Sequence, residues 1–315
     1  MQRIAILLLA GLPLLAEIRL GIIGTDTSHA IAFTKILNDP KHPEHIHGAK
    51  VVAAFKGGSR DVESSWSRVD KYAEELSRDW KVEIVPDIAT LLTKVDGILL
   101  ESVDGRPHLE QAKAVIAAGK PLFIDKPLAA RYEDALEIAR LAEAKGVKWF
   151  SSSSLRWAKS LNPLRQPSLK GAITWGPGPT EEHHYLDMAW YGIHAAEMLF
   201  TLMGRGCETV TRTTAPEQDE ITCRWKDGRI GTMRALRPYS NFGAVAILQD
   251  NKIIQSAEKF AYSYVPLVQA IVDFFTTGKV PVDPAETLEI FAFLDAAQKS
   301  KEQGGRPVAL KAAKP

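Results

Sequence analysis

Two residues far apart in this chain are suited to proton transfer. Lys126 directly follows the apolar run PLFID (121–125). Ligands of open α/β folds bind at the carboxyl ends of parallel strands, so an amine at this position can meet a substrate and stabilise negative charge on its oxygen. His194 lies in AWYGIHAAE (189–197), and an imidazole can accept a hydroxyl proton because its pKa is close to neutral pH. The alternatives are that Lys126 is a solvated surface lysine, which is the more common case for a lysine taken alone, and that His194 is a core histidine.

A second group of candidate residues follows the first predicted strand, in LGIIGTDTSHAIAF (20–33). This stretch has the layout of a dinucleotide-binding turn, whose usual pattern is G-x-G-x-x-G. Gly24 fills the first glycine position, whereas Asp26 and His29 occupy the second and third. A carboxylate at the second position repels a pyrophosphate, unless it caps the following helix and points away. Two outcomes stay open: a cofactor bound with altered geometry, or a lost cofactor and a pocket for another ligand.

The end of the second predicted strand bears on the kind of cofactor. A carboxylate that binds the ribose is expected near this point in NAD-binding folds, but FKGGSR (55–60) offers Lys56 and Arg60 instead. Two cations here favour a 2′-phosphate and hence NADP. Thr25 and Ser28 can still donate hydrogen bonds near the N-terminus of the following helix.

The stretch HHYLD (183–187) places two histidines and an aspartate shortly before His194. Imidazole and carboxylate ligands suit zinc and similar ions. Adjacent histidines point apart on a strand, so at most one of them could join such a site. We therefore expect a polar pocket wall and assign no metal ligands. On a helix, Asp187 and Tyr191 would share a face with His194 and could act with it.

Strand and helix patterns alternate through the first half of the chain and must position these residues. Six runs have the apolar character of buried strands: 18–23, 50–55, 82–85, 96–102, 121–125 and 147–152. Helical patterns separate them, including 108–119 and 132–146, which both end at a glycine. This alternation predicts an α/β domain with a doubly wound parallel sheet.

The second half of the chain has a different pattern. From residue 171 to residue 259, short strand-like runs alternate with turns such as KDG (226–228), which indicates antiparallel strands. Helical stretches lie at 186–204, 264–278 and 286–304. We therefore predict an α/β domain over 17–128 and an α+β domain with a mixed or antiparallel sheet over 129–315.

The first sixteen residues resemble a secretory signal peptide. A short basic start precedes the apolar run IAILLLAGLPLLA (4–16), which is too short to span a bilayer comfortably. A misassigned start or an extra apolar strand is the alternative. We expect an exported or periplasmic protein if the signal is real and a cytoplasmic one otherwise. In an oxidising compartment Cys207 and Cys223 could form one disulfide.

The composition excludes several classes of protein. The chain has 315 residues, of which 45% are hydrophobic and 24% charged, and its net charge is +1. This length allows two domains and a well-buried core. No basic stripe indicates a nucleic-acid partner, and we expect no membrane span in the mature chain. A homo-oligomer is possible, but the sequence does not decide the oligomeric state.

These motifs together resemble the Gfo/Idh/MocA oxidoreductases, the group of glucose–fructose oxidoreductase and inositol dehydrogenase. GIIG (21–24) is similar to the family's first strand and turn, DKP (125–127) to its E-K-P motif, and residues 270–310 to its C-terminal pattern. The resemblance implies a Rossmann domain that binds NAD or NADP and a second domain that carries the substrate. It implies an oxidoreductase that moves hydride between nicotinamide and a sugar, polyol or related carbohydrate.

The resemblance also implies a set of site residues. Proton transfer would fall to Lys126 and His194, with Asp187 and Tyr191 as helpers, because Trp190 replaces the aspartate that the family has four residues before the histidine. The expected cofactor-binding residues are Gly24, Thr25, Asp26, Ser28, His29, Lys56, Ser102, His108, Asp125 and Lys126. The expected substrate-binding residues are Arg156, Trp157, His184 and Tyr185.

Trp190 and the altered glycine pattern leave two other functions open. One is a non-redox lyase, epimerase or glycosidase that acts on keto-sugars. The other is a binding protein that has kept the fold and lost the cofactor.

Overall fold

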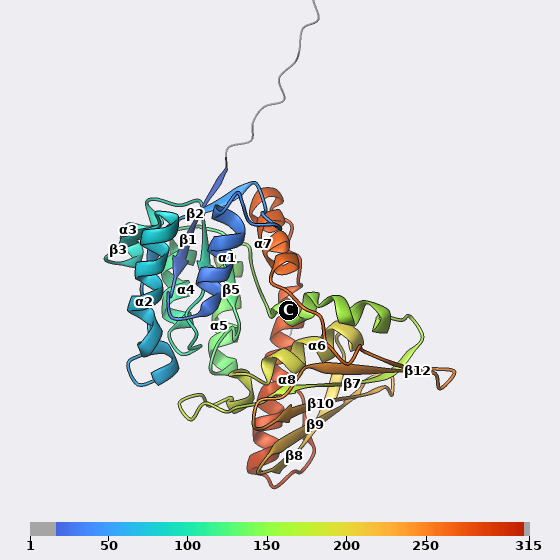
Figure 1. The fold of residues 1–315 in the computed structure, drawn as a ribbon. Coiled ribbons are helices and arrows are strands. Elements are labelled where there is room, and N and C mark those ends of the chain that lie inside the picture. Colours follow the sequence, from blue (N-terminus) through green and yellow to red (C-terminus); the bar gives the residue numbers. More distant parts are fainter. Residues whose placement is uncertain (1–16, 312–315) are drawn as a thin grey trace, which may run out of the picture.

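The computed structural model describes residues 17–311. The predicted signal sequence, residues 1–16, lies outside the described residues. Two sheets organise the described chain, one in each half of the molecule (Figure 1).

The first sheet is parallel throughout and has the strand order β3-β2-β1-β4-β5-β6. Its strands are β1 (Ile18–Ile23), β2 (Ala49–Phe55), β3 (Glu83–Val85), β4 (Gly97–Leu100), β5 (Leu122–Asp125) and β6 (Trp149–Ser152). The helices between them are α1 (Ser28–Asn38), α2 (Glu63–Trp80), α3 (Ile88–Leu92), α4 (His108–Ala117) and α5 (Tyr132–Lys145). Every residue of β4, β5 and β6 is buried, as expected for strands covered on both faces. The predicted doubly wound fold is confirmed.

The strand order reverses between β1 and β4, which lie side by side. In open α/β sheets the crevice at such a reversal, outside the carboxyl ends of the strands, is where ligands bind. The carboxyl ends of β1, β4 and β5 therefore define the place to look for a site.

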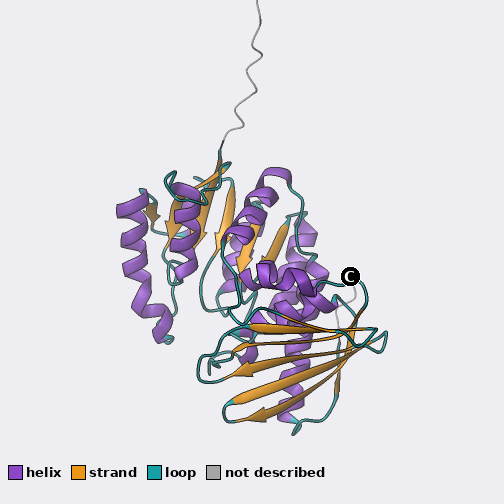
Figure 2. Cartoon of the chain, turned by 45° about the vertical axis from the view of Figure 1, so that its right-hand side comes forward, coloured by secondary structure: helices purple, strands orange, loops and turns teal. Residues whose placement is uncertain are grey.

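The second sheet is mixed and mostly antiparallel, with the order β12-β11-β7-β10-β9-β8-β13. Only the pair β7 and β10 is parallel. The strands are β7 (Leu169–Pro177), β8 (Cys207–Ala215), β9 (Gln218–Trp225), β10 (Ile230–Leu236), β11 (Gly243–Leu248), β12 (Ile253–Gln255) and β13 (Val308–Ala309). Buried and exposed residues alternate along β9, since one face packs on helices and the other does not (Figure 2).

The rest of the described chain contains the α-helices α6 (Ile193–Met203), α7 (Val265–Thr277) and α8 (Pro284–Glu302), and short 3-10 helices at Ser154–Trp157, Lys159–Leu164 and Asp187–Ala189. Helix α7 returns to the first domain, where Leu267 and Ile271 join the same core as Leu20 and Phe33. The first sheet also continues past the boundary predicted at residue 128, because β6 adds to it. Among the described residues, no helix combines the length and the apolar character needed to cross a bilayer.

A disulfide joins Cys207 on β8 to Cys223 on β9, with a Cα–Cα distance of 5.9 Å. The sequence allowed this pair without deciding it. The bond ties two neighbouring antiparallel strands in the second sheet.

Candidate active site

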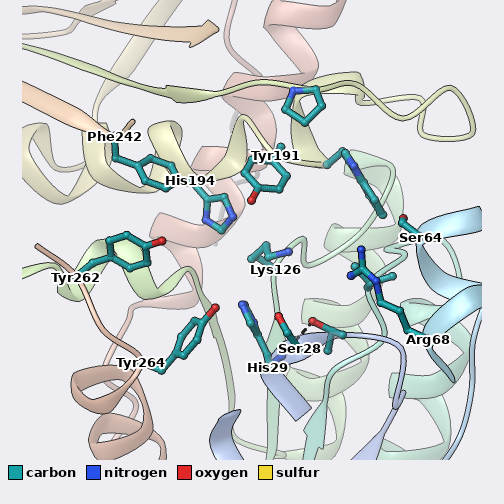
Figure 3. Close-up of a pocket in the computed structure, with 14 residues that line it drawn as sticks. Ser28, His29, Ser64, Arg68, Lys126, Tyr191, His194, Phe242, Tyr262 and Tyr264 are labelled. Atoms are coloured by element: carbon teal, nitrogen blue, oxygen red, sulfur yellow. Dashed lines mark hydrogen bonds between the residues drawn. The ribbon is translucent and has the colours of Figure 1, made fainter. Parts of the chain in front are cut away.

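A cavity of about 270 Å³ opens between the carboxyl edge of the first sheet and the second domain. Ser28 and His29 line it from α1, and Lys126 from the segment after β5 (Figure 3). Tyr191 and His194 line it from the second domain. The structure therefore brings five of the predicted site residues into one space.

Lys126 lies at the centre of this cavity in the close-up, between His194 on one side and His29 on the other (Figure 3). It is buried, although it carries an amine. A buried ammonium lacks the screening that water gives, so its field acts strongly on a bound oxygen. This position fits the predicted role in stabilising developing negative charge.

His194 lies in the first turn of α6 and is buried. Its Nδ1 is 2.7 Å from the hydroxyl of Ser153, which follows β6. Burial, together with the charge of Lys126, holds the pKa of His194 well below its ordinary value. A neutral imidazole has a lone pair to accept a proton, and Ser153 can fix the tautomer that frees Nε2 for this purpose.

The depressed pKa of His194 predicts a pH-dependent stability. Below about pH 6.5 the unfolded chain takes up a proton at this residue that the folded chain does not, so stability is lost as the pH falls. Each pH unit over which a buried imidazole stays neutral costs about 1.4 kcal/mol. We expect the melting temperature of the wild type to fall more than that of His194→Asn between about pH 7.5 and about pH 5.

The matched control is the same replacement at exposed His47. This variant should follow the wild-type melting curve at every pH. Equal pH dependence of the wild type and His194→Asn would show that His194 is protonated in the folded protein.

Tyr191 and Trp190 also line the cavity. The Tyr191 ring lies 5.1 Å from that of His194, edge to face. Burial, with the neighbouring Tyr239, raises the pKa of Tyr191 above its ordinary value, so its hydroxyl keeps its proton. Trp190, at the position where the sequence resemblance implies an aspartate, packs edge-on against His184 at 5.3 Å between ring centres.

The expected role of Asp187 beside His194 is wrong in its geometry. Asp187 begins a short 3-10 turn (Asp187–Ala189), and α6 starts only at Ile193, so the two residues do not share a helix face. The carboxylate binds the guanidinium of Arg212 at 2.7 and 3.0 Å and the amine of Lys301 at 2.7 Å. It is an ion-pair partner and does not line the cavity.

The four predicted substrate-binding residues also lie away from the cavity lining. Arg156 is buried in ion pairs with Glu197 and Glu286, each at 2.6 Å. The Trp157 indole donates to the hydroxyl of Ser152. These contacts fix the junction after β6.

The other two residues of that prediction are held by neighbours in the same way. His184 binds the carboxylate of Asp104 at 2.9 Å through Nε2. Tyr185 lies beneath the guanidinium of Arg131. His183 binds Glu181, so the histidines of this stretch and Asp187 do not converge.

The turn after β1 needs a glycine at its first position, Gly24, and ends in a capped helix. Gly24 has φ +95°, and a Cβ there would lie 2.3 Å from the backbone nitrogen of Ser102. Thr27 is the N-cap of α1 and accepts from the backbone N–H of His29. Thr25 is buried and donates to the carbonyl of Val69 at 2.8 Å, so it supports the turn from behind.

Asp26 neither caps α1 nor lines the cavity. Its carboxylate accepts from the hydroxyl of Ser65 on α2 at 2.6 Å and from the backbone N–H of Val103 at 3.3 Å. Burial raises the pKa of Asp26 above its ordinary value, which favours the uncharged form. The predicted repulsion of a pyrophosphate is therefore weakened, because the carboxyl group is bound to Ser65 and Val103 and does not line the cavity.

This arrangement changes the expected effect of Asp26→Gly. The variant leaves the Ser65 hydroxyl and the Val103 N–H without their acceptor, which costs about 1–3 kcal/mol of stability. The affinity for NAD should change little, because the carboxyl group does not face the cavity. Chemical denaturation and calorimetric titration measure the two effects separately. A large gain in NAD affinity would show that the carboxylate does reach the cofactor.

Lys56, Ser102 and His108 lie outside the cavity lining. The Lys56 amine pairs with exposed Asp70 at 2.8 Å. Ser102 donates to Gln111 at 3.0 Å, and buried His108 lies 2.8 Å from the Ser102 carbonyl through Nε2. These two residues brace the loop after β4 and contribute to the site only indirectly.

The side chain of His29, which lines the cavity, also lies close to two buried carboxyl groups, those of Asp125 and Glu101. Its Nδ1 lies 2.6 Å from Asp125. Glu101, directly after β4, is fully buried, and neither of its carboxyl oxygens has a partner among the described residues. Burial, and then the charge of Asp125, raises the pKa of Glu101 well above its ordinary value. The signal in the sequence was a lone carboxylate at the end of the apolar run ILL (98–100).

Several residues that line the cavity were not predicted from the sequence. Ser64 and Arg68 come from α2, and Phe242, Tyr262 and Tyr264 come from segments around β11 and before α7. Among the described residues, no carboxylate forms an ion pair with Arg68, although it is half-buried. The spacing of Arg68 one turn after Ser64 was a usable signal, whereas the tyrosines lie in an irregular segment without one.

The residues at this edge fit a dinucleotide. The N-terminus of α1 opens to the cavity at Thr27 and Ser28, and a helix N-terminus favours phosphate. Two cations, Arg68 and Lys126, line the same cavity and can attract a phosphate (Figure 3). Asp26 does not oppose this fit, because it is held by Ser65.

Comparisons with known proteins agree with this geometry. Residues 18–153 match the model of the Gfo/Idh/MocA family, described as an oxidoreductase family with an NAD-binding Rossmann fold. No curated protein matches the chain.

Several solved structures share the fold. Myo-inositol 2-dehydrogenase from Lactobacillus plantarum has a TM-score of 0.77 at 16% identity, over 94% of this chain and 100% of that one. Myo-inositol dehydrogenase from Lactobacillus casei, in complex with NAD(H) and myo-inositol, has a TM-score of 0.74 at 16% identity, over 95% and 98%. Apo scyllo-inositol dehydrogenase from the same organism has a TM-score of 0.71 at 16% identity, over 93% and 98%.

Proposed function

We propose that this chain is an oxidoreductase of the Gfo/Idh/MocA family, whose NAD-binding Rossmann model its residues 18–153 match, and that it transfers hydride between NAD and a sugar, polyol or related carbohydrate. The main observation behind this proposal is that Lys126 and His194 line the same cavity. One comes from the carboxyl edge of the Rossmann sheet and the other from the second domain, and both line one cavity beside the N-terminus of α1.

The lining of the cavity supports a polyhydroxylated substrate. Tyrosines at 191, 262 and 264 surround Lys126 and His194 together with Phe242 (Figure 3). Hydroxyl groups and charged side chains can bind substrate hydroxyls, and ring faces can cover the apolar side of a sugar ring. The solved dehydrogenase that holds myo-inositol has the same fold.

Three side chains of the cavity would have separate roles in the oxidation of the substrate. Bound NAD would supply the hydride acceptor. His194 takes the proton of the substrate hydroxyl, because burial keeps its imidazole neutral. Lys126 stabilises the negative charge that develops on the same oxygen. Tyr191, beside His194, keeps its proton and binds a neighbouring hydroxyl of the substrate.

We propose NAD rather than NADP as the preferred cofactor. The two cations predicted to favour a 2′-phosphate have partners on the surface, since Lys56 pairs with Asp70 and Arg60 lies over the ring of Trp66. Both contacts compete with a phosphate for the same charge.

Calorimetric titration of the purified chain with NAD⁺, NADH and NADP⁺ tests the proposed cofactor. We expect saturable binding of NAD⁺ or NADH and weaker binding of NADP⁺. Native mass spectrometry of the sample as purified gives an independent reading, because a retained dinucleotide adds its own mass. Absence of binding to all three would favour a protein that has lost the cofactor.

We also propose that the protein works in an oxidising compartment outside the cytoplasm. The apolar N-terminal run and the Cys207–Cys223 pair both support this location. Fractionation of the native host, followed by thiol labelling of the mature chain, tests it. A cytoplasmic protein with two free thiols would contradict it.

A further inference from the structure

Three buried side chains converge where the strand order of the first sheet reverses. His29 comes from the first turn of α1, Glu101 follows β4, and Asp125 ends β5. Each offers one ligand atom, and these atoms lie within 4.8 Å of one another. This is the spread that one ion could gather with small side-chain movements, because metal–ligand distances in such sites are close to 2 Å.

Contacts within the described chain explain this convergence only in part, through the 2.6 Å contact of His29 Nδ1 with Asp125. Both oxygens of Glu101 and one oxygen of Asp125 are buried without a hydrogen-bond partner. Glu101 is 0% exposed. Buried polar groups in folded proteins are nearly always paired, so an unpaired buried carboxyl group indicates a missing partner.

The charge of the cluster identifies the missing partner as a cation. Glu101 lies within electrostatic reach of Asp125, Asp26 and Lys126. Carboxyl oxygens that lack a hydrogen-bond donor are suited to a cation. A divalent ion bound by Glu101 and Asp125 would balance the charge of both carboxylates.

We propose that His29, Glu101 and Asp125 form a binding site for a divalent transition-metal ion. One imidazole nitrogen with carboxylate oxygens suits manganese, iron or zinc, whereas magnesium and calcium prefer oxygen ligands alone. Three protein ligands leave coordination positions open, and His29 also lines the cavity that holds Lys126 and His194. The ion would therefore lie beside the proposed substrate, but its binding does not depend on the substrate or on NAD.

The test is calorimetric titration of the full chain with MnCl₂, ZnCl₂ and MgCl₂ after treatment with a chelator. We expect one Mn²⁺ or Zn²⁺ per chain and no measurable Mg²⁺ binding. Glu101→Gln keeps the shape of the side chain and should weaken metal binding by about tenfold to a hundredfold, since it removes a ligand charge. His29→Asn should weaken it similarly.

A matched control separates this site from adventitious binding on the surface. His183, with Glu181, is a part-exposed histidine–carboxylate pair elsewhere, so His183→Asn should leave metal binding unchanged. Circular dichroism of each variant checks its fold, and metal-induced rise of the melting temperature gives a second readout. The inference is overturned if the wild type binds neither ion, if Glu101→Gln binds as tightly as the wild type, or if only His183→Asn abolishes binding.

Discussion

Replacing Lys126 by alanine should lower the turnover number by about a hundredfold or more and leave the fold intact. The amine lines the cavity and is largely buried, so its charge is screened less by solvent than that of a surface lysine. Because charge on the substrate oxygen develops mainly in the transition state, the turnover number should fall more than the Michaelis constant rises. Steady-state kinetics with NAD and the best carbohydrate substrate measure both parameters.

The matched control is Lys120→Ala. Lys120 precedes β5, whereas Lys126 follows it, so the two amines lie at opposite edges of the first sheet. We expect wild-type turnover from this control and nearly unchanged melting temperatures from both variants. Near-wild-type activity of Lys126→Ala would remove the amine from the mechanism.

Replacing Gly24 by alanine should destabilise the protein by about 3–5 kcal/mol. The residue has φ +95°, and a Cβ would meet the backbone nitrogen and Cα of Ser102 at 2.3 and 2.5 Å. Both obstacles are backbone atoms, so no side chain can turn aside to relieve the contact. The loop after β4 would have to move, and with it the wall of the site that holds Glu101.

Gly119→Ala separates the contact at Gly24 from backbone strain alone. Gly119 also has positive φ, at +69°, but nothing lies within 4 Å of a Cβ added there. We expect this control to cost only about 1 kcal/mol. Equal losses in chemical denaturation would mean that the approach of Ser102 to Gly24 is not what makes the glycine necessary.

The elements that carry local patterns were predictable from the sequence. Alternating apolar runs and glycine-terminated helical patterns predicted the parallel sheet, and the position of Lys126 after a buried strand predicted its place at the carboxyl edge. In the structure His194 and His29 both line the cavity. The predictions of the sheet and of its carboxyl edge rest on features that lie within a few residues of each other.

The failures depend on partners that are distant in the sequence. Asp187 was expected beside His194, but its carboxylate forms an ion pair with Arg212 on β8. The guanidinium of Arg156 donates a hydrogen bond to the carboxylate of Glu286, which is 130 residues further along the chain. The hydroxyl that binds Asp26 belongs to Ser65 on α2, so neither role expected for that carboxylate applied.

The measurement that tests the proposed function most directly is the formation of reduced nicotinamide by the purified chain. Wild type and Lys126→Ala would be incubated with NAD⁺ and a panel of sugars and polyols that includes myo-inositol, and the absorbance of NADH followed. We predict that at least one carbohydrate gives NADH with the wild type and that Lys126→Ala loses nearly all of this rate. NADH formation that is equal in both proteins, or a panel that reacts without any change in nicotinamide absorbance, would contradict hydride transfer at the Lys126–His194 cavity.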